Sequence, residues 1–369
     1  MKILKVRVGE LKEFIGSELY RNSNYIPIAR LRAESYIQNP HASNSDPVLY
    51  LKVLNGEIIA YRSVLVDEFF DGSARQKCIW LSGTWVHSEY RRRGLSTQLL
   101  KTVTEDWGHR IAAANFAPAA EKLLLRSGIF EEWRVLEGMR FYHRFCFGHL
   151  LPPRYAVFKF AKPALQAADW LLNTLDSMRF KNRWSALSKG DLRVERMNRL
   201  SDGDWNFLQK FLKGSGFRRN RSTWEWLLSH PWASSDVSGR EEQKRFPFTS
   251  WGKDFKWGLF RIKDGNGALK GIAALVFNKG QLKIPYAFFE EGEEDYLKSF
   301  VLLQMKELKP LFITVFDKNL ISVIAPEKGV YWHKREFRHW FFIHRDWLPQ
   351  MKNGDSVQLL HGDGETVFT

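Results

Sequence analysis

The segment with the clearest chemical content is a short basic turn that leads into a helix. It reads Val86-His87-Ser88-Glu89-Tyr90-Arg91-Arg92-Arg93-Gly94-Leu95-Ser96-Thr97. An apolar run over residues 78–86 predicts a strand before the turn, and apolar residues at helical spacing predict a helix from Gly94 onward. The free N–H groups and the dipole of a helix N-terminus attract anions, and a glycine has no Cβ to obstruct them. With three arginines beside it, the turn predicts a cradle for a pyrophosphate.

The elements around this turn follow a regular order. Strands are predicted at residues 48–54, 57–66 and 78–86, and Asn55-Gly56 predicts a hairpin between the first two. After the helix come a strand at 109–116, a helix at 118–127 and a strand at 133–143. Pro118 would begin the second helix, and Gly128 would end it. This order predicts an α/β (α+β) fold in which a mixed sheet is flanked by helices.

Two motifs within this order resemble the GNAT N-acetyltransferase superfamily. Motif A of that family reads Arg/Gln-x-x-Gly-x-Gly/Ala, and here it reads Arg91-x-x-Gly94-x-Ser96. The segment 120–130 resembles the second helix of the family, which often reads Ala-x-x-Leu-Tyr-x-x-x-Gly-Phe. The resemblance implies a GNAT domain at residues 1–150 that binds acetyl-CoA or another acyl-CoA. The cofactor-binding residues that it implies are Trp85, Val86, Arg91, Arg92, Arg93, Gly94, Leu95, Ser96 and Thr97.

Two catalytic positions of the family hold residues that cannot exchange a proton usefully. Trp80 stands where the general-base Glu often lies, and Leu124 stands at the place of the general-acid Tyr. Glu68, with Asp67 behind it, is the candidate base, and an ordinary solvated carboxylate is the alternative interpretation. His87 lies where the resemblance places a strand-end bulge, and we interpret it as a hydrogen-bonding spacer. A backbone N–H near Val86 would polarise the thioester carbonyl.

Residues 191–369 repeat the same order of elements without motif A. Strands are predicted at 192–197, 257–263, 269–278, 282–289, 311–316 and 337–344, and helices at 202–212, 221–231 and 293–308. An acidic run at residues 290–295 precedes the last of these helices, and its charge would repel a pyrophosphate. We therefore expect the GNAT-type sheet twice, with 191–369 a degenerate domain that shapes the acceptor site. Residues 151–190, which include an amphipathic helix at 163–179, are expected to be a linker packed on one or both domains.

Two further features have a functional and a structural interpretation. Trp224 and Trp226 on the helix at 221–231 could stack on a substrate, but helical aromatic residues usually belong to the core, and we favour the core. The segment Gly362-Asp363-Gly364-Glu365 could reach into the cleft between the domains or form an exposed turn. Both interpretations of this segment stay open at this point.

Composition limits the partners of the chain. The 369 residues carry a formal charge of +15, spread over both halves, which favours anionic partners such as coenzyme A or an anionic acceptor. Basic residues among aromatic ones also suit RNA, but no RNA-binding or DNA-binding signature accompanies them. Cys78 and Cys146 are interpreted as core thiols, and no metal site is predicted. No apolar run is long enough to span a bilayer, and no export signal is present at the N-terminus, so a cytoplasmic location is expected.

These observations lead to one leading hypothesis and two alternatives. The leading one is an acyl-CoA-dependent N-acyltransferase that acts on the amine of a small, anionic acceptor, with an amino sugar suggested by family analogy alone. The first alternative is an aminoacyl-tRNA-dependent transferase of the tandem-GNAT type, which the positive charge would suit. The second is a non-catalytic module that binds acyl-CoA, which the replacements at Trp80 and Leu124 would allow.

Overall fold

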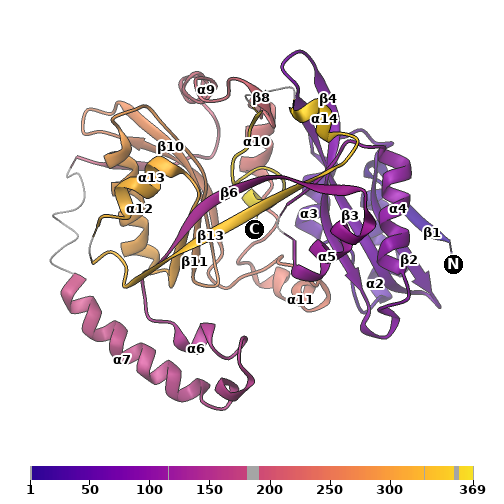
Figure 1. The fold of residues 1–369 in the computed structure, drawn as a ribbon, viewed down its shortest axis with the longest axis horizontal. Helices are drawn as coiled ribbons and strands as arrows, with labels where there is room; N and C mark the ends of the chain where they lie inside the picture. The colour runs from indigo at the N-terminus through magenta and orange to yellow at the C-terminus, as the bar shows by residue number, and fades with distance from the viewer. Residues whose placement is uncertain (1, 115, 181–190, 328, 353–356, 369) are drawn as a thin grey trace. The chain divides into compact units, whose positions relative to one another are not determined.

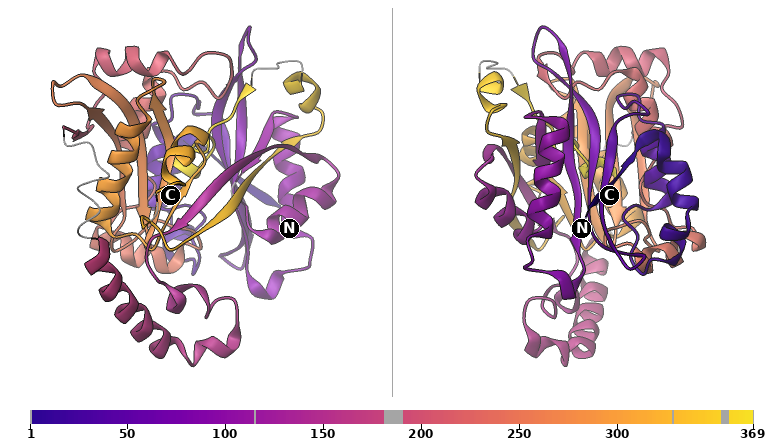
Figure 2. Two further views of the ribbon diagram at one scale, coloured as in Figure 1. Left: turned by 60° about the vertical axis from the view of Figure 1, so that its left-hand side comes forward. Right: turned by 90° about the vertical axis from the view of Figure 1, so that its right-hand side faces the viewer.

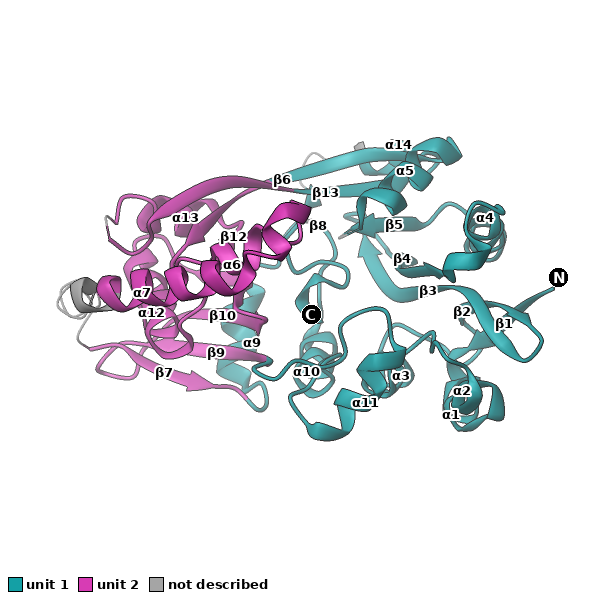
Figure 3. Ribbon diagram, turned by 90° about the horizontal axis from the view of Figure 1, so that it is seen from below, with its two compact units in different colours: residues 1–136, 198–255, 339–369 teal, residues 137–197, 256–338 magenta. Residues whose placement is uncertain are grey.

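The computed structural model describes residues 2–114, 116–180, 191–327, 329–352 and 357–368 (Figure 1). The chain divides into two compact units, each built from separate segments (Figure 3). Unit 1 contains residues 1–136, 198–255 and 339–369, and unit 2 contains residues 137–197 and 256–338.

The sheet of unit 1 contains the strands that precede and follow the basic turn. Its order is β1 (Ile3–Arg7), β2 (Pro47–Leu54), β3 (Glu57–Phe70), β4 (Arg75–Val86), β5 (Ile111–Ala114) and the end of β13 (His333–His344). Neighbours in β1–β4 are antiparallel, β4 and β5 are parallel, and β13 is antiparallel to β5. Asn55 and Gly56 both have positive φ, which is the geometry of the predicted hairpin turn.

Helices cover both faces of this sheet (Figure 3). α4 (Leu95–Trp107) and α5 (Pro118–Ser127) lie on one side, and α4 buries Leu99, Leu100 and Val103. On the other side lie α1 (Leu11–Gly16), α2 (Glu18–Asn22), α3 (Arg30–Ile37), α10 (Arg221–Ser229) and α11 (Val237–Arg245). α5 begins at Pro118 and ends before Gly128, whose φ of 71° is left-handed, as the sequence predicts.

Unit 1 also holds several shorter elements. They are η1 (Val8–Glu10), η2 (Ser88–Tyr90), α9 (Asp202–Gln209), β8 (Ser215–Gly216), α14 (Leu348–Lys352), β14 (Val357–Gln358) and η4 (Thr366–Phe368). Ser201 accepts a hydrogen bond from the Asp204 N–H as the N-cap of α9. Trp224 and Trp226 of α10 are buried, and the Trp226 indole N–H donates to the Ser35 carbonyl at 2.8 Å. The core interpretation of these two tryptophans is therefore confirmed.

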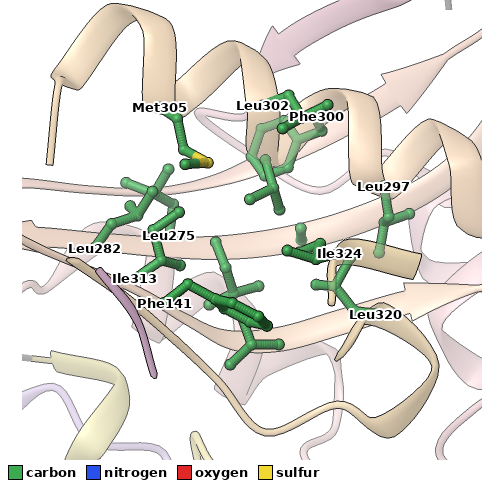
Figure 4. Close-up of a cluster of buried hydrophobic side chains, with 14 of the residues drawn as sticks. Phe141, Leu275, Leu282, Leu297, Phe300, Leu302, Met305, Ile313, Leu320 and Ile324 are labelled. Carbon is green, nitrogen blue, oxygen red and sulfur yellow. The ribbon is translucent and has the colours of Figure 1, made fainter. Parts of the chain in front are cut away.

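The sheet of unit 2 has the order β7 (Arg193–Arg196), β9 (Lys256–Lys263), β10 (Leu269–Asn278), β11 (Gln281–Phe289), β12 (Phe312–Val315) and the end of β6 (Phe130–Tyr142). β11 and β12 are parallel, and the other neighbours are antiparallel. α12 (Glu294–Leu308) and α13 (Lys318–Ile324) pack on this sheet through a continuous apolar cluster (Figure 4). The cluster includes Phe141, Leu275, Leu282, Leu297, Phe300, Leu302, Met305, Ile313, Leu320 and Ile324.

The same order of elements occurs twice along the chain. The series β2, β3, β4, α4, β5, α5, β6 is repeated as β9, β10, β11, α12, β12, α13, β13. The last strand of each series pairs with the penultimate strand of the other, because β6 pairs with β12 and β13 pairs with β5. This exchange of strands is one reason why the compact units are discontinuous and do not follow the predicted boundaries at 150 and 190. Residues 198–255 and 339–369 belong to unit 1.

The predicted linker forms part of unit 2. It contains α6 (Phe147–Leu150), η3 (Ala156–Lys159) and α7 (Lys162–Phe180), whereas its residues 181–190 lie outside the described residues. The leucines of α7 pack against the protein only in part, since Leu165 and Leu172 are half-buried whereas Leu171 and Leu175 are exposed. None of the helices in the described part of the chain has the length and apolarity needed to cross a membrane.

Candidate active site

The basic turn has the geometry of an anion cradle. Gly94 is the N-cap of α4 with a φ of 73°, and no side chain caps the first turn of that helix. A Cβ built on Gly94 would meet no described atom within 4 Å, so the space over the helix N-terminus is open. Arg91, Arg92 and Arg93 are exposed around it. These features fit the phosphate groups of coenzyme A, which need backbone N–H donors, positive charge and close backbone approach.

Internal contacts hold this turn in place. The Arg91 Nε–H donates to the Val86 carbonyl at 3.2 Å, and the Arg93 guanidinium lies over the Tyr90 ring. Arg92 has a φ of 63°, which is unusual for a residue other than glycine. His87 accepts a hydrogen bond from the Glu89 N–H through Nδ1, which agrees with its interpretation as a spacer.

Near its centre β4 has a β-bulge, and its pairing with β5 ends at the same place. In the pairing with β3, Leu81 lies opposite Val64 and Gly83 lies opposite Ser63, so Ser82 has no partner. Among the described residues, the ladder between β4 and β5 extends only from Ile79 to Leu81. In the part of the chain that the structure describes, β5 pairs with no residue of β4 beyond Leu81. The bulge therefore lies at Ser82, and its expected position at His87 was wrong by five residues.

A carboxylate from the far end of the chain lies at this bulge. The Ser82 hydroxyl makes a short contact with the Glu365 carboxylate, and a further short contact joins it to the Arg32 guanidinium. Arg32 Nη2 lies 3.5 Å from Glu365 Oε2 in an ion pair that is largely buried. Arg32, Ser82 and Glu365 all belong to unit 1, although Ser82 and Glu365 are 283 residues apart in sequence.

Arg32 is fixed by its own surroundings. Its Nε and Nη2 lie 3.2 and 3.0 Å from the Tyr36 hydroxyl, and its guanidinium stacks over the Trp232 ring at 4.1 Å. Burial raises the pKa of Tyr36, so this phenol remains protonated at neutral pH. These contacts hold the Arg32 guanidinium against the Glu365 carboxylate.

Trp80, which stands where the GNAT family often has its general base, has a structural role in this protein. Its indole N–H donates to Asp67 Oδ2 at 3.0 Å, and its ring packs against Phe217 and Phe341. Gly364 lies directly on this ring, because a Cβ there would come within 3.1 Å of it. The segment 362–365 is therefore a packed loop of unit 1, and its interpretation as an exposed turn was wrong.

Glu68 lies within β3, not just beyond it, and is held by two basic side chains. Its carboxylate lies 3.0 Å from Arg75 Nη1 and 3.4 Å from His41 Nδ1. In the β3–β4 register Glu68 lies opposite Lys77, whereas the bulge lies near Ser63. At the rise of an extended strand, the five residues from Ser63 to Glu68 correspond to roughly 17 Å. The structure therefore separates Glu68 from the bulge and brings Glu365 to it.

An aromatic group lies on the same part of β3 and β4. Trp85 stacks on Tyr61 with ring centroids 5.7 Å apart and contacts Tyr25 at 4.5 Å. The Tyr61 hydroxyl is buried and has no hydrogen-bond partner among the described residues, and burial raises its pKa. Gly83 allows β4 to lie close to β3 beside this group, since a Cβ there would lie 2.8 Å from Ser63 Oγ. A protonated phenol without a partner suits a site that donates a hydrogen bond to a bound molecule.

Sequence reasoning did not identify Arg32, Ser82 or Tyr61, and did not assign a role to Glu365. Glu365 carried one usable signal, because glycines precede it at residues 362 and 364 and permit a tight loop. Arg32 carried none, since its contacts with Ser82, Trp232 and Glu365 are made to residues far away in sequence. Leu124 is buried on α5, which is the environment of an ordinary core residue.

Comparisons with known proteins give one family match. Residues 17–122 match the family model described as "Acetyltransferase (GNAT) family". No curated protein matches the chain.

Several solved structures are similar at low sequence identity. A GCN5-related N-acetyltransferase from Anabaena variabilis is 10% identical with a TM-score of 0.48, covering 92% of this chain and 72% of that one. A tandem GNAT protein from the clavulanic acid biosynthesis pathway is 9% identical with a TM-score of 0.45, covering 92% and 97%. N-myristoyltransferase from Saccharomyces cerevisiae, with bound myristoyl-CoA, is 10% identical with a TM-score of 0.49, covering 93% and 78%.

The matched residues include β2–β5, the basic turn and α4, all of which lie in unit 1. The repeated order of elements places a second copy of the same arrangement later in the chain. Residues 17–122 therefore match a GNAT acetyltransferase domain, and the order of elements that begins within them occurs a second time later in the chain.

Proposed function

We propose that this protein is an acyl-CoA-dependent N-acyltransferase in which Glu365 is the general base. The observation that carries the proposal is the coincidence of three features in unit 1. The bulge at Ser82, the end of the β4–β5 ladder and the Glu365 carboxylate all occur at one place on β4. The acetyltransferase family match supports the same class of reaction.

The turn and the open edge of β4 would bind the acyl donor. Arg91, Arg92 and Arg93 and the first-turn N–H groups of Leu95, Ser96 and Thr97 would hold its phosphates. Trp85 and Val86 would flank the chain that leads from the phosphates toward the bulge. Backbone N–H groups on the open edge of β4 would polarise the carbonyl. The acyl-CoA itself supplies a thioester, whose thiolate is a tolerable leaving group.

Glu365 would accept the proton that the acceptor nitrogen loses as it bonds to the acyl carbon. Arg32 would act as a positioning residue that keeps the carboxylate charged and aimed at β4. The Tyr61 hydroxyl would donate a hydrogen bond to a bound substrate. Acetyl-CoA is the donor that we propose, and a small anionic amine such as an amino sugar is the first acceptor class to test.

Binding can be tested by calorimetry with acetyl-CoA. The double variant Arg93→Glu/Gly94→Glu should lose binding by at least about tenfold, because it puts negative charge and a strained residue into the cradle. The matched control is Arg134→Glu/Gly72→Glu, which makes the same changes at an exposed arginine and an exposed left-handed glycine elsewhere in unit 1. Equal loss in both variants would contradict a specific cradle. If wild type binds no acyl-CoA, salt-sensitive tRNA binding becomes the next test.

Catalysis can be tested with two carboxylate variants in an amine screen. Glu365→Gln should lower kcat by roughly 100-fold or more with an unchanged KM for acetyl-CoA, which is the usual contribution of a general base. Glu68→Gln should stay close to wild type. Loss of kcat in Glu68→Gln alone would return the role to Glu68, as predicted from the sequence. Binding of acetyl-CoA without turnover of any amine would identify a non-catalytic module.

A further inference from the structure

One surface of unit 2 exposes an unusual number of large apolar side chains. Six of the twelve exposed large hydrophobic residues in the described chain lie between residues 155 and 175. They are Tyr155, Val157, Phe160, Trp170, Leu171 and Leu175, with Phe160 and Trp170 exposed by 93% and 70%. Figures 1 and 2 show this segment as a hairpin of α6 and α7 at the edge of the unit. We call the six residues the hairpin patch.

The inner side of α7 carries Asp169 and Asn173 beside the half-buried Leu165 and Leu172, and its outer side is apolar. Asp169 is buried and accepts hydrogen bonds from the N–H groups of Phe147 and Gly148, both at 2.8 Å. The Asn173 side chain accepts a hydrogen bond from the Phe145 N–H and donates one to the Phe145 carbonyl, both at 2.9 Å. Polar contacts therefore attach α7 to the start of α6.

The opposite face of α7 is apolar and exposed over several turns. Residues 164, 167, 168, 171 and 175 are spaced as one helical stripe, and all five are Ala or Leu and exposed. Because the attachment to α6 is polar, this stripe is not needed to hold the helix in place. A helix of a soluble unit normally buries such a stripe, so its exposure indicates a partner.

The charges beside the patch specify the kind of partner. Arg154, Lys159 and Lys162 are exposed around it. The two acidic residues of α7, Asp169 and Asp176, are buried and partly buried, respectively, and lie on its inner side. Apolar and aromatic side chains bordered by basic residues are typical of helices that lie in the interface of an anionic membrane. The formal charge of +15 adds attraction to such a surface.

We propose that the hairpin patch docks this protein on anionic lipid bilayers, with α7 lying in the plane of the interface. Phe160, Leu171 and Leu175 enter the acyl boundary, and Lys159 and Lys162 contact the phosphate groups of the lipids. This binding is peripheral and reversible. It is independent of the proposed acyl transfer, because every residue involved belongs to unit 2.

Vesicle sedimentation with the full chain tests this proposal. Wild type should sediment with vesicles of phosphatidylglycerol in phosphatidylcholine and stay in solution with phosphatidylcholine alone. Leu171→Asp/Leu175→Asp should reduce the bound fraction at a given lipid concentration by roughly tenfold or more, because both residues lose their apolar contact. The matched control Leu125→Asp/Val237→Asp makes the same kind of change at exposed apolar residues of unit 1 and should bind like wild type.

A third variant separates charge from apolar contact. Lys159→Glu/Lys162→Glu should weaken binding to anionic vesicles, and added salt should weaken wild type in the same way. Failure of wild type to bind anionic vesicles would overturn the proposal, as would binding that the α7 variant leaves unchanged. A wild-type dimer in sedimentation equilibrium that Leu171→Asp/Leu175→Asp converts to monomer would overturn it too, since the patch would then be a contact between two copies.

Discussion

At the scale of single residues, several buried groups in this protein have their ionisation set by their surroundings. His143 is the clearest case in unit 2. Burial lowers its pKa from 6.5 to about 4, and the contact of its Nδ1 with the Val330 carbonyl at 2.9 Å assigns the proton of the neutral ring to that nitrogen. The folded protein therefore holds this imidazole neutral where an unfolded chain would protonate it.

This shift predicts a loss of stability in mild acid. Between pH 6.5 and 4 the unfolded chain binds a proton at His143 that the folded chain does not, so the free energy of unfolding falls as pH falls. From pH 7 to pH 5 the loss from this residue should be about 2 kcal/mol. Urea titrations at the two pH values measure it. His143→Gln should reduce the pH dependence, while His333→Gln, at an exposed position, should keep it.

Glu365 and Glu68 show how the same side chain serves different purposes in one unit. Glu68 contacts Arg75 and His41 at a distance from the bulge. Glu365 forms an ion pair with Arg32 and contacts the hydroxyl of Ser82, two residues after Trp80 on β4. Both residues are glutamates, so their different positions relative to the bulge account for the different roles that we propose.

At the scale of elements, the exchange of final strands is the main architectural feature. β6 leaves the first series to pair with β12, and β13 leaves the second to pair with β5. Close backbone packing accompanies the first of these pairings. A Cβ on Gly138 in β6 would lie 2.5 Å from the Phe316 ring and 2.7 Å from the Val315 carbonyl oxygen.

Gly138→Ala should therefore destabilise unit 2. The clash involves backbone, which cannot rotate away, so we expect the free energy of unfolding to fall by about 1–3 kcal/mol. Glu137→Ala, at the exposed neighbouring position, is the control and should change little. Urea unfolding followed by fluorescence measures both variants. Equal stability of the two would contradict the close packing of β6 on β12.

At the scale of the whole molecule, unit 1 is assembled from three distant segments of chain. Residues 198–255 and 339–369 join residues 1–136 in one core. The Trp232 indole N–H donates to Ser35 Oγ at 2.9 Å, and its ring stacks on Phe368 with centroids 4.2 Å apart. The C-terminal segment that carries Glu365 is thus held by residues from the other two segments.

Removal of this anchor should affect both stability and the proposed catalysis. Phe368→Ala should cost about 3–5 kcal/mol of unfolding free energy, because the ring is fully buried. It should also lower acyl transfer, since Glu365 lies three residues upstream on the same anchored segment. Phe160→Ala, at a 93% exposed position, is the control for stability. Thermal unfolding and the amine assay report the two effects, and a variant that unfolds like wild type would show that the segment is held by other contacts.

Local sequence determined much of the fold. Turn residues and periodicity act over a few neighbours, and they predicted the hairpin at Asn55-Gly56, the bounds of the helix at 118–127 and the strand at 269–278. The basic turn with Gly94 could be predicted equally well, because its anion-binding geometry is made by consecutive residues. The motif and the order of elements were enough to predict the family whose model matches residues 17–122.

Tertiary structure alone decided which strand pairs with which and which carboxylate lies at the bulge. β6 and β13 follow the same position in each series, so no local pattern distinguishes their partners. The contact of Ser82 with Glu365 spans 283 residues, and it depends on a C-terminal loop packed on Trp80 and Trp232. Periodicity shows which side of a segment is buried. These contacts depend instead on which distant part of the chain packs against that side.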